Sequence, residues 1–228
     1  MAQDCAYFTI WMYSFTIELS ILEVRTIMEK KDYLKILVEQ IHSTTIATIA
    51  ADGHPQTRVI DMMLWDENGV YFLTAKGKAF YAQLMEQKYI ALSATKDKLS
   101  ISLRGKIRNI HGEKLDEIFE KNTYMQKIYP GDTRSALEVF QLYEAEGEYF
   151  DISEPAHIVR DSFVIGNATK TEGGYYVQEG CTACQSCLEV CPQKCIDITK
   201  FPVEIDQNHC LHCGRCEEIC PQKVIVKR

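Results

Sequence analysis

A duplicated cysteine pattern near the C-terminus constrains this chain more than any other feature of its sequence. Cysteines separated by two, two and three residues and closed by a Cys-Pro pair occur twice, 29 residues apart. The first run holds Cys181, Cys184, Cys187 and Cys191, followed by Pro192, and the second holds Cys210, Cys213, Cys216 and Cys220, followed by Pro221. Three thiolates from a tight loop can reach three corners of a cubane cluster, and the fourth cysteine of such a run binds the other cluster. The spacing therefore predicts two [4Fe–4S] clusters and electron transfer.

The crossed arrangement assigns the eight cysteines to two sets. The first cluster is expected on Cys181, Cys184, Cys187 and Cys220, and the second on Cys210, Cys213, Cys216 and Cys191. Zinc is the alternative, because C-x₂-C pairs also build zinc ribbons, but zinc does not explain the third cysteine and the Cys-Pro in both runs. Cys195 aligns with Val224 in the repeat and is interpreted as a small core residue. His209 and His212 are interpreted as non-ligands, since both sets are already complete.

Charge and cysteine distribution narrow the class of protein further. The 228 residues carry a net charge of −7 spread along the chain, which argues against nucleic acid or an anionic membrane as a partner. Nine of the ten cysteines lie after residue 180, and such crowding suits metal binding in a reducing compartment better than disulfides. We therefore expect a cytoplasmic protein.

The first 27 residues need separate treatment. The stretch 5–17 is apolar, but Glu18 and Glu23 interrupt it, and no Lys or Arg precedes Arg25. A membrane span or secretory signal is therefore disfavoured. We expect 1–27 to be a poorly structured extension, with Met28 opening the ordered protein.

The middle of the chain reads as many short strands with a few bracketing helices. Apolar periodicity and turn pairs predict helices at 33–41, 79–87, 113–121 and 135–145 and strands at 44–50, 57–65, 70–74, 89–95, 99–110, 148–152 and 156–166. Short strands joined by tight turns favour an antiparallel barrel over a parallel sheet. The predicted fold class is α+β. The expected division is a barrel over 28–166, a polar linker over 167–179 and a ferredoxin-like domain over 180–228.

The end of one predicted strand has the composition of a phosphate site. Thr74, Lys76 and Lys78 surround a glycine where the strand meets a predicted helix, and Arg58 lies in the preceding strand. Hydroxyl and cationic groups at a helix N-terminus suit a phosphate, although solvated lysines are the ordinary alternative. No G-x-G-x-x-G motif follows a strand, so a dinucleotide fold is not indicated.

The run GHPQTRVIDMMLWDENGVYFLTAKGKAFYAQL, together with ISLRGKIRNI and the stretch ending near Phe140, resembles the pyridoxamine 5′-phosphate oxidase family of FMN-binding split barrels. The resemblance covers most of 30–166 and implies FMN at the interface of a homodimer formed through the barrel. It implies FMN contacts from Arg58, Val59, Ile60, Leu73 and Thr74, with Lys76 or Lys78 on the phosphate. The family's lysine at the end of the arginine strand is Met63 here, and its Ser-Arg-Lys appears as Lys78-Ala79-Phe80.

The family's C-terminal substrate segment has no counterpart, because the cysteine repeat occupies that place. Pyridoxamine phosphate oxidase activity is therefore not expected. The leading hypothesis is a flavin and iron–sulfur oxidoreductase that exchanges electrons with an external ferredoxin or reductase. The alternatives are an electron carrier without turnover, in which FMN is a relay, and a barrel that binds haem or a deazaflavin. No catalytic acid or base is assigned; His54 and His111 are interpreted as structural or surface residues.

Overall fold

The structure is a computed structural model that describes residues 28–228. The interpretation of 1–27 as an unstructured extension lies outside this range. In chain order the elements of the first part are α2 (Lys30–Lys35), η1 (Ile36–Ile41), β1 (Ser43–Ile49), β2 (Pro55–Asp66), β3 (Gly69–Ala75), α3 (Ala79–Gln87), β4 (Tyr89–Lys96), β5 (Leu99–Asn109), α4 (Leu115–Lys121), α5 (Met125–Ile128), η2 (Gly131–Ala136), β6 (Leu137–Asp151) and β7 (Val159–Ile165). The second part contains β8 (Tyr175–Val177), α6 (Ser186–Val190), β9 (Ile196–Asp197), β10 (Glu204–Ile205), α7 (Arg215–Ile219) and β11 (Ile225–Lys227).

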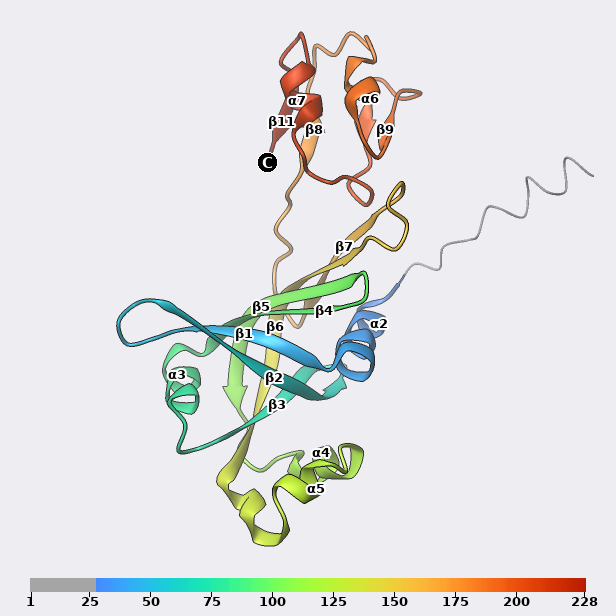
Figure 1. The fold of residues 1–228 in the computed structure, drawn as a ribbon. Helices are drawn as coiled ribbons and strands as arrows, with labels where there is room; N and C mark the ends of the chain where they lie inside the picture. Colours follow the sequence, from blue (N-terminus) through green and yellow to red (C-terminus); the bar gives the residue numbers. More distant parts are fainter. Residues whose placement is uncertain (1–27) are drawn as a thin grey trace, which may run out of the picture.

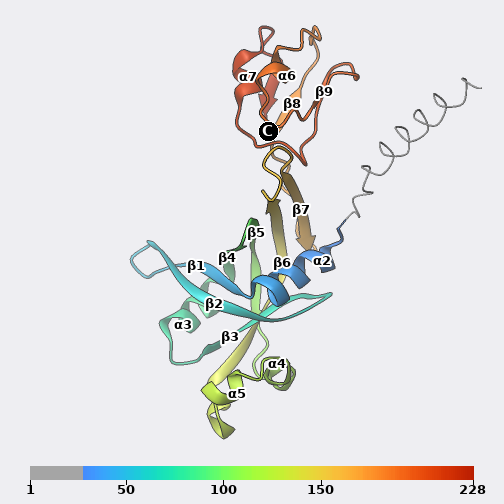
Figure 2. The ribbon, with the colours of Figure 1, turned by 45° about the vertical axis from the view of Figure 1, so that its right-hand side comes forward.

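The first seven strands form one antiparallel sheet that closes on itself. The order is β3-β2-β1-β4-β5-β6-β7, and an additional pairing between β3 and β6 joins six of the strands into a barrel (Figures 1 and 2). Strand β7 pairs with β6 outside the closed ring. The predicted antiparallel barrel is therefore confirmed.

Alternating side chains fill the barrel. In β4 every second residue is buried, and Ile90, Leu92 and Ala94 point into the core. Phe72 and Phe140, on facing strands, stack with ring centroids 5.7 Å apart. The expected alternation of β2 breaks near its end, because a bulge between Met62 and Leu64 shifts the register and buries three consecutive residues.

One predicted helix is wrong. The stretch predicted as a helix at 135–145 contains the beginning of β6, which runs without a break into the strand predicted at 148–152. Leu137 and Phe140 are three residues apart, as on a helix face, but the segment is flanked by strands that supply hydrogen bonds on both sides. Because the first half of β6 is buried on both faces, it lacks the strict alternation that marks a half-exposed strand.

The helices bracket the barrel. The predicted helix at 33–41 is present as α2 and a π-helical turn, η1, and buries Leu34 and Leu37 in the core. Helix α3 has the bounds expected for 79–87, and α4 occupies most of 113–121. Helices α4 and α5 cover the end of the barrel farthest from the C-terminal domain (Figure 1). Within residues 28–228 no helix combines the length and apolar character needed to span a bilayer.

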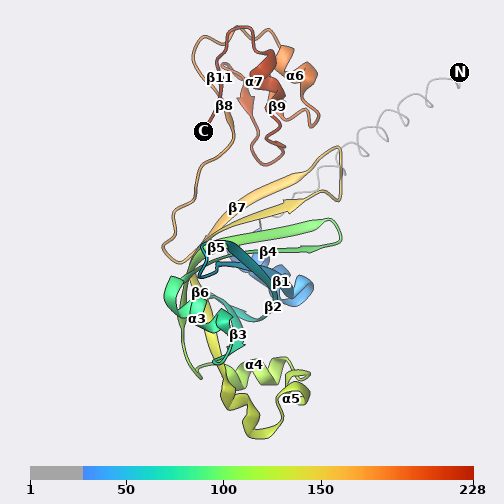
Figure 3. The same cartoon turned by 60° about the vertical axis from the view of Figure 1, so that its left-hand side comes forward.

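The C-terminal part is a small two-fold repeat. Helices α6 and α7 contact one another, β8 pairs with β11, and β9 pairs with β10. Its core is made largely of buried cysteines, joined by Tyr175, Ile196, Val203, Ile205 and Ile225. An extended segment leads from β7 along the barrel to β8 (Figure 3).

Candidate functional site

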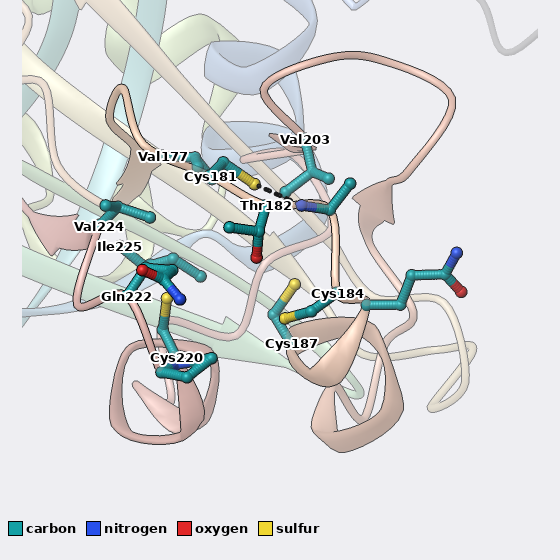
Figure 4. Close-up of a pocket in the computed structure, with 13 residues that line it drawn as sticks. Val177, Cys181, Thr182, Cys184, Cys187, Val203, Cys220, Gln222, Val224 and Ile225 are labelled. Carbon is teal, nitrogen blue, oxygen red and sulfur yellow. Dashed lines mark hydrogen bonds between the residues drawn. The ribbon is translucent and has the colours of Figure 1, made fainter.

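Two cavities in the C-terminal part are lined by cysteines. Four residues of the first cavity are Cys181, Cys184, Cys187 and Cys220, and four of the second are Cys191, Cys210, Cys213 and Cys216. Each cavity therefore receives three cysteines from one repeat and the closing cysteine from the other. Figure 4 shows the four sulfurs of the first cavity directed toward the space between the loop before α6 and the end of α7. The structure brings together the same two groups that the sequence spacing predicts.

The loops that present the cysteines are built alike in both repeats. The backbone has a positive φ at Ala183 and again at His212, 29 residues later, which curls each loop around its cavity. In both loops this residue donates its backbone N–H to a cysteine Sγ at 3.4 Å, Ala183 to Cys181 and His212 to Cys210. Backbone N–H donors stabilise thiolates, so donor set and loop geometry fit [4Fe–4S] clusters.

The fifth cysteine of the second cavity is Cys195. It is buried, and its Sγ lies 3.6 Å from Sγ of Cys191. Val224, which aligns with Cys195 in the repeat, lines the first cavity at the equivalent place. The position therefore accepts a small apolar side chain in one half of the domain and a thiol in the other.

The half of the domain that contains the second cavity faces the barrel. Gln193, which lines that cavity, accepts a hydrogen bond from the backbone N–H of Ile158 at 2.9 Å and donates one to the carbonyl of Pro155 at 2.9 Å. The backbone N–H of Arg160 donates to the carbonyl of Asn208 at 2.8 Å. These contacts attach the second cavity, rather than the first, to the β6–β7 end of the barrel.

In the barrel, Arg58 lies on β2 and points toward α3. Its two terminal nitrogens donate to Oγ1 of Thr48 and Oε1 of Gln56, each at 2.6 Å. Its guanidinium lies 4.4 Å from the centroid of the Phe80 ring, in the first turn of α3. Arg58 is thus held in place beside the N-terminus of α3, and the residue as a whole is half-buried.

Thr74 and Lys78 lie on either side of the turn between β3 and α3. Oγ1 of Thr74 is buried and has no hydrogen-bond partner among residues 28–228. Lys78 is the exposed N-cap residue of α3, and its ammonium has no partner in the same part of the chain. A buried orphan hydroxyl, a free ammonium and a nine-residue helix N-terminus together fit a phosphate group.

The other predicted contacts differ in exposure. Val59 is 69% exposed, Ile60 is half-buried, and Leu73, near the end of β3, is buried. Lys76 is exposed, but its Nζ lies 3.2 Å from Oε1 of Glu138. Of the two lysines considered for a phosphate, Lys76 is thus engaged by a carboxylate, and only Lys78 is free.

Sequence reasoning missed a polar network around Glu138. This carboxylate is buried on β6, opposite Thr74, and accepts hydrogen bonds from the hydroxyl of Tyr81 at 2.6 Å and from the amide of Asn109. These bonds, chiefly that of Tyr81, together with Lys76, lower the pKa of Glu138 to about 2. Because 135–145 was predicted as a helix, Glu138 was not placed at the end of a barrel strand.

Comparisons with known proteins agree with this description. The sequence profile of the family described as pyridoxamine 5′-phosphate oxidase matches residues 31–150, and that of the 4Fe-4S dicluster domain matches residues 169–224. Together they define a split-barrel protein joined to an iron–sulfur domain. The chain belongs to the pyridoxamine 5′-phosphate oxidase family. The iron–sulfur profile favours the cluster prediction over zinc.

Three solved structures are similar to part of this chain. A NimC/NimA family protein from Clostridium acetobutylicum has 17% identity and a TM-score of 0.49, covering 59% of this chain and 92% of its own. A pyridoxamine 5′-phosphate oxidase-related, FMN-binding protein from Nostoc punctiforme has 13% identity and a TM-score of 0.42, with 60% and 94% covered. A protein related to general stress protein 26, also from C. acetobutylicum, has 17% identity and a TM-score of 0.46, with 60% and 96% covered. No curated protein matches the sequence significantly.

Proposed function

We propose that this protein is an FMN-dependent oxidoreductase that passes electrons between an unidentified substrate or donor and two [4Fe–4S] clusters. The observation that carries the proposal is the pair of cavities, each lined by three cysteines of one repeat and the closing cysteine of the other. The first cluster would be held by Cys181, Cys184, Cys187 and Cys220, and the second by Cys210, Cys213, Cys216 and Cys191.

The barrel would hold FMN through its phosphate. Lys78 and the N-terminus of α3 would supply positive charge, Thr74 a hydroxyl donor, and Arg58 its guanidinium. FMN, when bound, exchanges electron pairs with organic substrates and single electrons with iron–sulfur centres. Val59, Ile60 and Leu73 would provide contacts beside the flavin, as the family resemblance implies. Lys76 is the weakest of the proposed contacts, because Glu138 already engages it.

A second copy of the chain is part of the proposal. Val59 and Ile49, on β2 and β1, are 69% and 48% exposed, and large apolar side chains on a sheet face favour burial against a partner. Homodimerisation through the barrel would cover them. A ferredoxin or reductase would then reach the first cluster, which lies in the half of the domain that does not contact β7. Thiolate ligands would require a reducing compartment such as the cytoplasm.

The test is anaerobic purification followed by absorption spectroscopy and measurement of flavin and iron content. We expect bound FMN and about eight iron atoms per chain, as two four-iron clusters require. Addition of dithionite should bleach both chromophores. Protein that contains iron but neither retains nor takes up FMN would overturn the proposal that the barrel binds FMN. A haem absorption spectrum would show that the barrel binds haem instead. If the protein is reduced reversibly but turns over no substrate in a screen, the result would favour the alternative in which it is an electron carrier without enzymatic activity.

A further inference from the structure

A cavity of about 260 Å³ lies at the junction between the barrel and the C-terminal domain. Strands β5, β6 and β7 form its floor, and the segment leading to β8 and His212 of the second cysteine loop border it. The residues that matter here are Ser102, Arg104, Glu146, Arg160, Ser162 and His212. The cavity is separate from the proposed flavin site at the N-terminus of α3.

Hydrogen bonds within the wall of the cavity already occupy one carboxylate. The Glu146 carboxylate accepts hydrogen bonds from Nη2 of Arg104 at 2.8 Å and from Nε of Arg104 at 3.1 Å. It also accepts hydrogen bonds from the backbone N–H of Thr171 at 2.7 Å and from the Thr171 hydroxyl at 3.1 Å. A second carboxylate, that of Glu148, forms an ion pair with Nη1 of Arg160. The acidic groups of the cavity are therefore engaged by cations of the protein itself.

Several polar groups in the same cavity have no hydrogen-bond partner within residues 28–228. Nε of Arg160 and Nε2 of His212 are buried and make no hydrogen bond within residues 28–228. The hydroxyls of Ser102 and Ser162 also lack a protein partner over that range. Buried polar groups are rarely left unpaired in proteins, so an orphan guanidinium N–H beside an orphan imidazole nitrogen indicates a group that the protein alone does not supply.

We propose that this cavity binds a small oxyanion, a carboxylate or phosphate group. The guanidinium N–H, the two hydroxyls and the His212 imidazole, in the tautomer that carries its proton on Nε2, would donate to its oxygens, while the Arg104–Glu146 pair holds the wall in place. At roughly 30 Å³ per water molecule, the volume corresponds to about eight or nine waters. Pockets for larger organic ligands start at about 300 Å³, so the occupant is smaller than a flavin.

The site adjoins the proposed second cluster. The backbone N–H of His212 donates to Sγ of Cys210, and the side chain of the same residue lines the cavity. A negative charge placed there would disfavour the addition of an electron to that cluster. Binding would thus lower the midpoint potential of the second cluster and leave that of the first nearly unchanged. Only this electrochemical effect rests on the proposed function; the binding itself does not.

The test is calorimetric titration of the purified holoprotein with inorganic phosphate, using chloride at equal ionic strength as the reference. Arg160→Lys keeps the charge opposite Glu148 but removes the Nε–H, and Ser162→Ala removes one hydroxyl. We expect at least tenfold weaker phosphate binding in Arg160→Lys and several-fold weaker binding in Ser162→Ala. Arg134→Lys is the matched control, because Arg134 is also ion-paired, with Asp116 at 3.1 Å, but lies in η2.

Phosphate could also enter the flavin site, so each titration is repeated in Arg58→Ala. Binding that survives Arg58→Ala and is lost in Arg160→Lys supports the junction site, whether or not FMN or iron is present. Binding lost in Arg58→Ala and unchanged in Arg160→Lys and Ser162→Ala overturns it. A holoprotein that binds no phosphate more tightly than chloride overturns it as well. In protein with both clusters, a potentiometric titration followed by electron paramagnetic resonance should show a shift in only one cluster.

Discussion

Gln193 and Gln222 occupy equivalent places in the two cysteine repeats, yet only Gln193 is buried. Gln193 is 8% exposed and bonds to the backbone of Ile158 and Pro155, whereas Gln222 is exposed. The two cysteine repeats have the same spacing in the sequence, but the barrel contacts the half of the domain that contains Gln193. The difference determines which of the two cysteine-lined cavities lies beside the barrel.

Replacing Gln193 should loosen the junction. Gln193→Ala leaves the N–H of Ile158 and the carbonyl of Pro155 without partners, at a cost of about 1–3 kcal/mol for each buried group that water does not reach. Hydrogen exchange measured by mass spectrometry should then become at least tenfold faster over the peptide that contains Ile158. Gln222→Ala is the matched control and should leave exchange unchanged. Equal effects of both substitutions would contradict the asymmetric docking.

The crossed cysteine assignment predicts a selective loss. Cys191→Ala should remove the second cluster, which is otherwise held by the second repeat, and about half of the iron. Cys195→Ala tests specificity, because its Sγ lies only 3.6 Å from that of Cys191, and it should leave both clusters in place. Iron analysis and electron paramagnetic resonance of the reduced protein distinguish the two clusters. Loss of the first cluster in Cys191→Ala would refute the crossing.

Arg58→Ala should weaken FMN binding without changing iron content. A hydrogen bond to a charged group contributes about 1.5–3 kcal/mol, which corresponds to roughly a 10- to 150-fold increase in the FMN dissociation constant. Fluorescence quenching during FMN titration measures this constant. Arg134→Ala serves as the control, since it also removes an arginine that lies over an aromatic ring. Unchanged affinity in Arg58→Ala would exclude this residue from the flavin site.

The hydrogen bonds to Glu138 should make the stability of the barrel depend on pH. The pKa of Glu138 is about 2 in the folded protein against an ordinary 4.5, so its contribution is present above pH 4.5 and disappears as the pH falls toward 2. Tyr81→Phe should therefore destabilise the barrel by about 1.5–3 kcal/mol at neutral pH and by less in acid. Urea unfolding followed by Trp65 fluorescence, in a Trp11→Phe background, measures this difference.

Tyr89→Phe is the control for that experiment, because Tyr89 lies exposed on β4 and makes no hydrogen bond through its hydroxyl in the described part of the chain. It should change stability little at any pH. A destabilisation by Tyr81→Phe that is constant from neutral pH into acid would show that the carboxylate of Glu138 is not the partner that matters.

The features that depend on residues close together in the sequence could be predicted from the sequence. The cysteines of each run are close together in the sequence, so their spacing indicated both cavities. The alternation of apolar and polar residues predicted strands such as β4. Strand β6 could not be recognised, because Leu137 and Phe140 also fit a helix and only the flanking strands decide between the two. The Glu138 network was missed for the same reason: Tyr81, Asn109 and Glu138 belong to three separate elements that meet only in the folded barrel.

The length of strand β6 separates the proposed flavin site from the junction between the barrel and the C-terminal domain. Glu138, beside the proposed phosphate site, and Glu148, at the junction cavity, are ten residues apart on this one strand, which corresponds to roughly 33 Å at about 3.3 Å per residue. A flavin phosphate at one end and the second cluster at the other would therefore stand at opposite ends of the same protomer. A bound flavin would shorten that distance only if its isoalloxazine ring extended from the phosphate toward the second cluster, or if a second copy of the chain brought its own cluster nearer. The proposed homodimer would then set the electron-transfer distance as well as bury the exposed apolar side chains of β1 and β2.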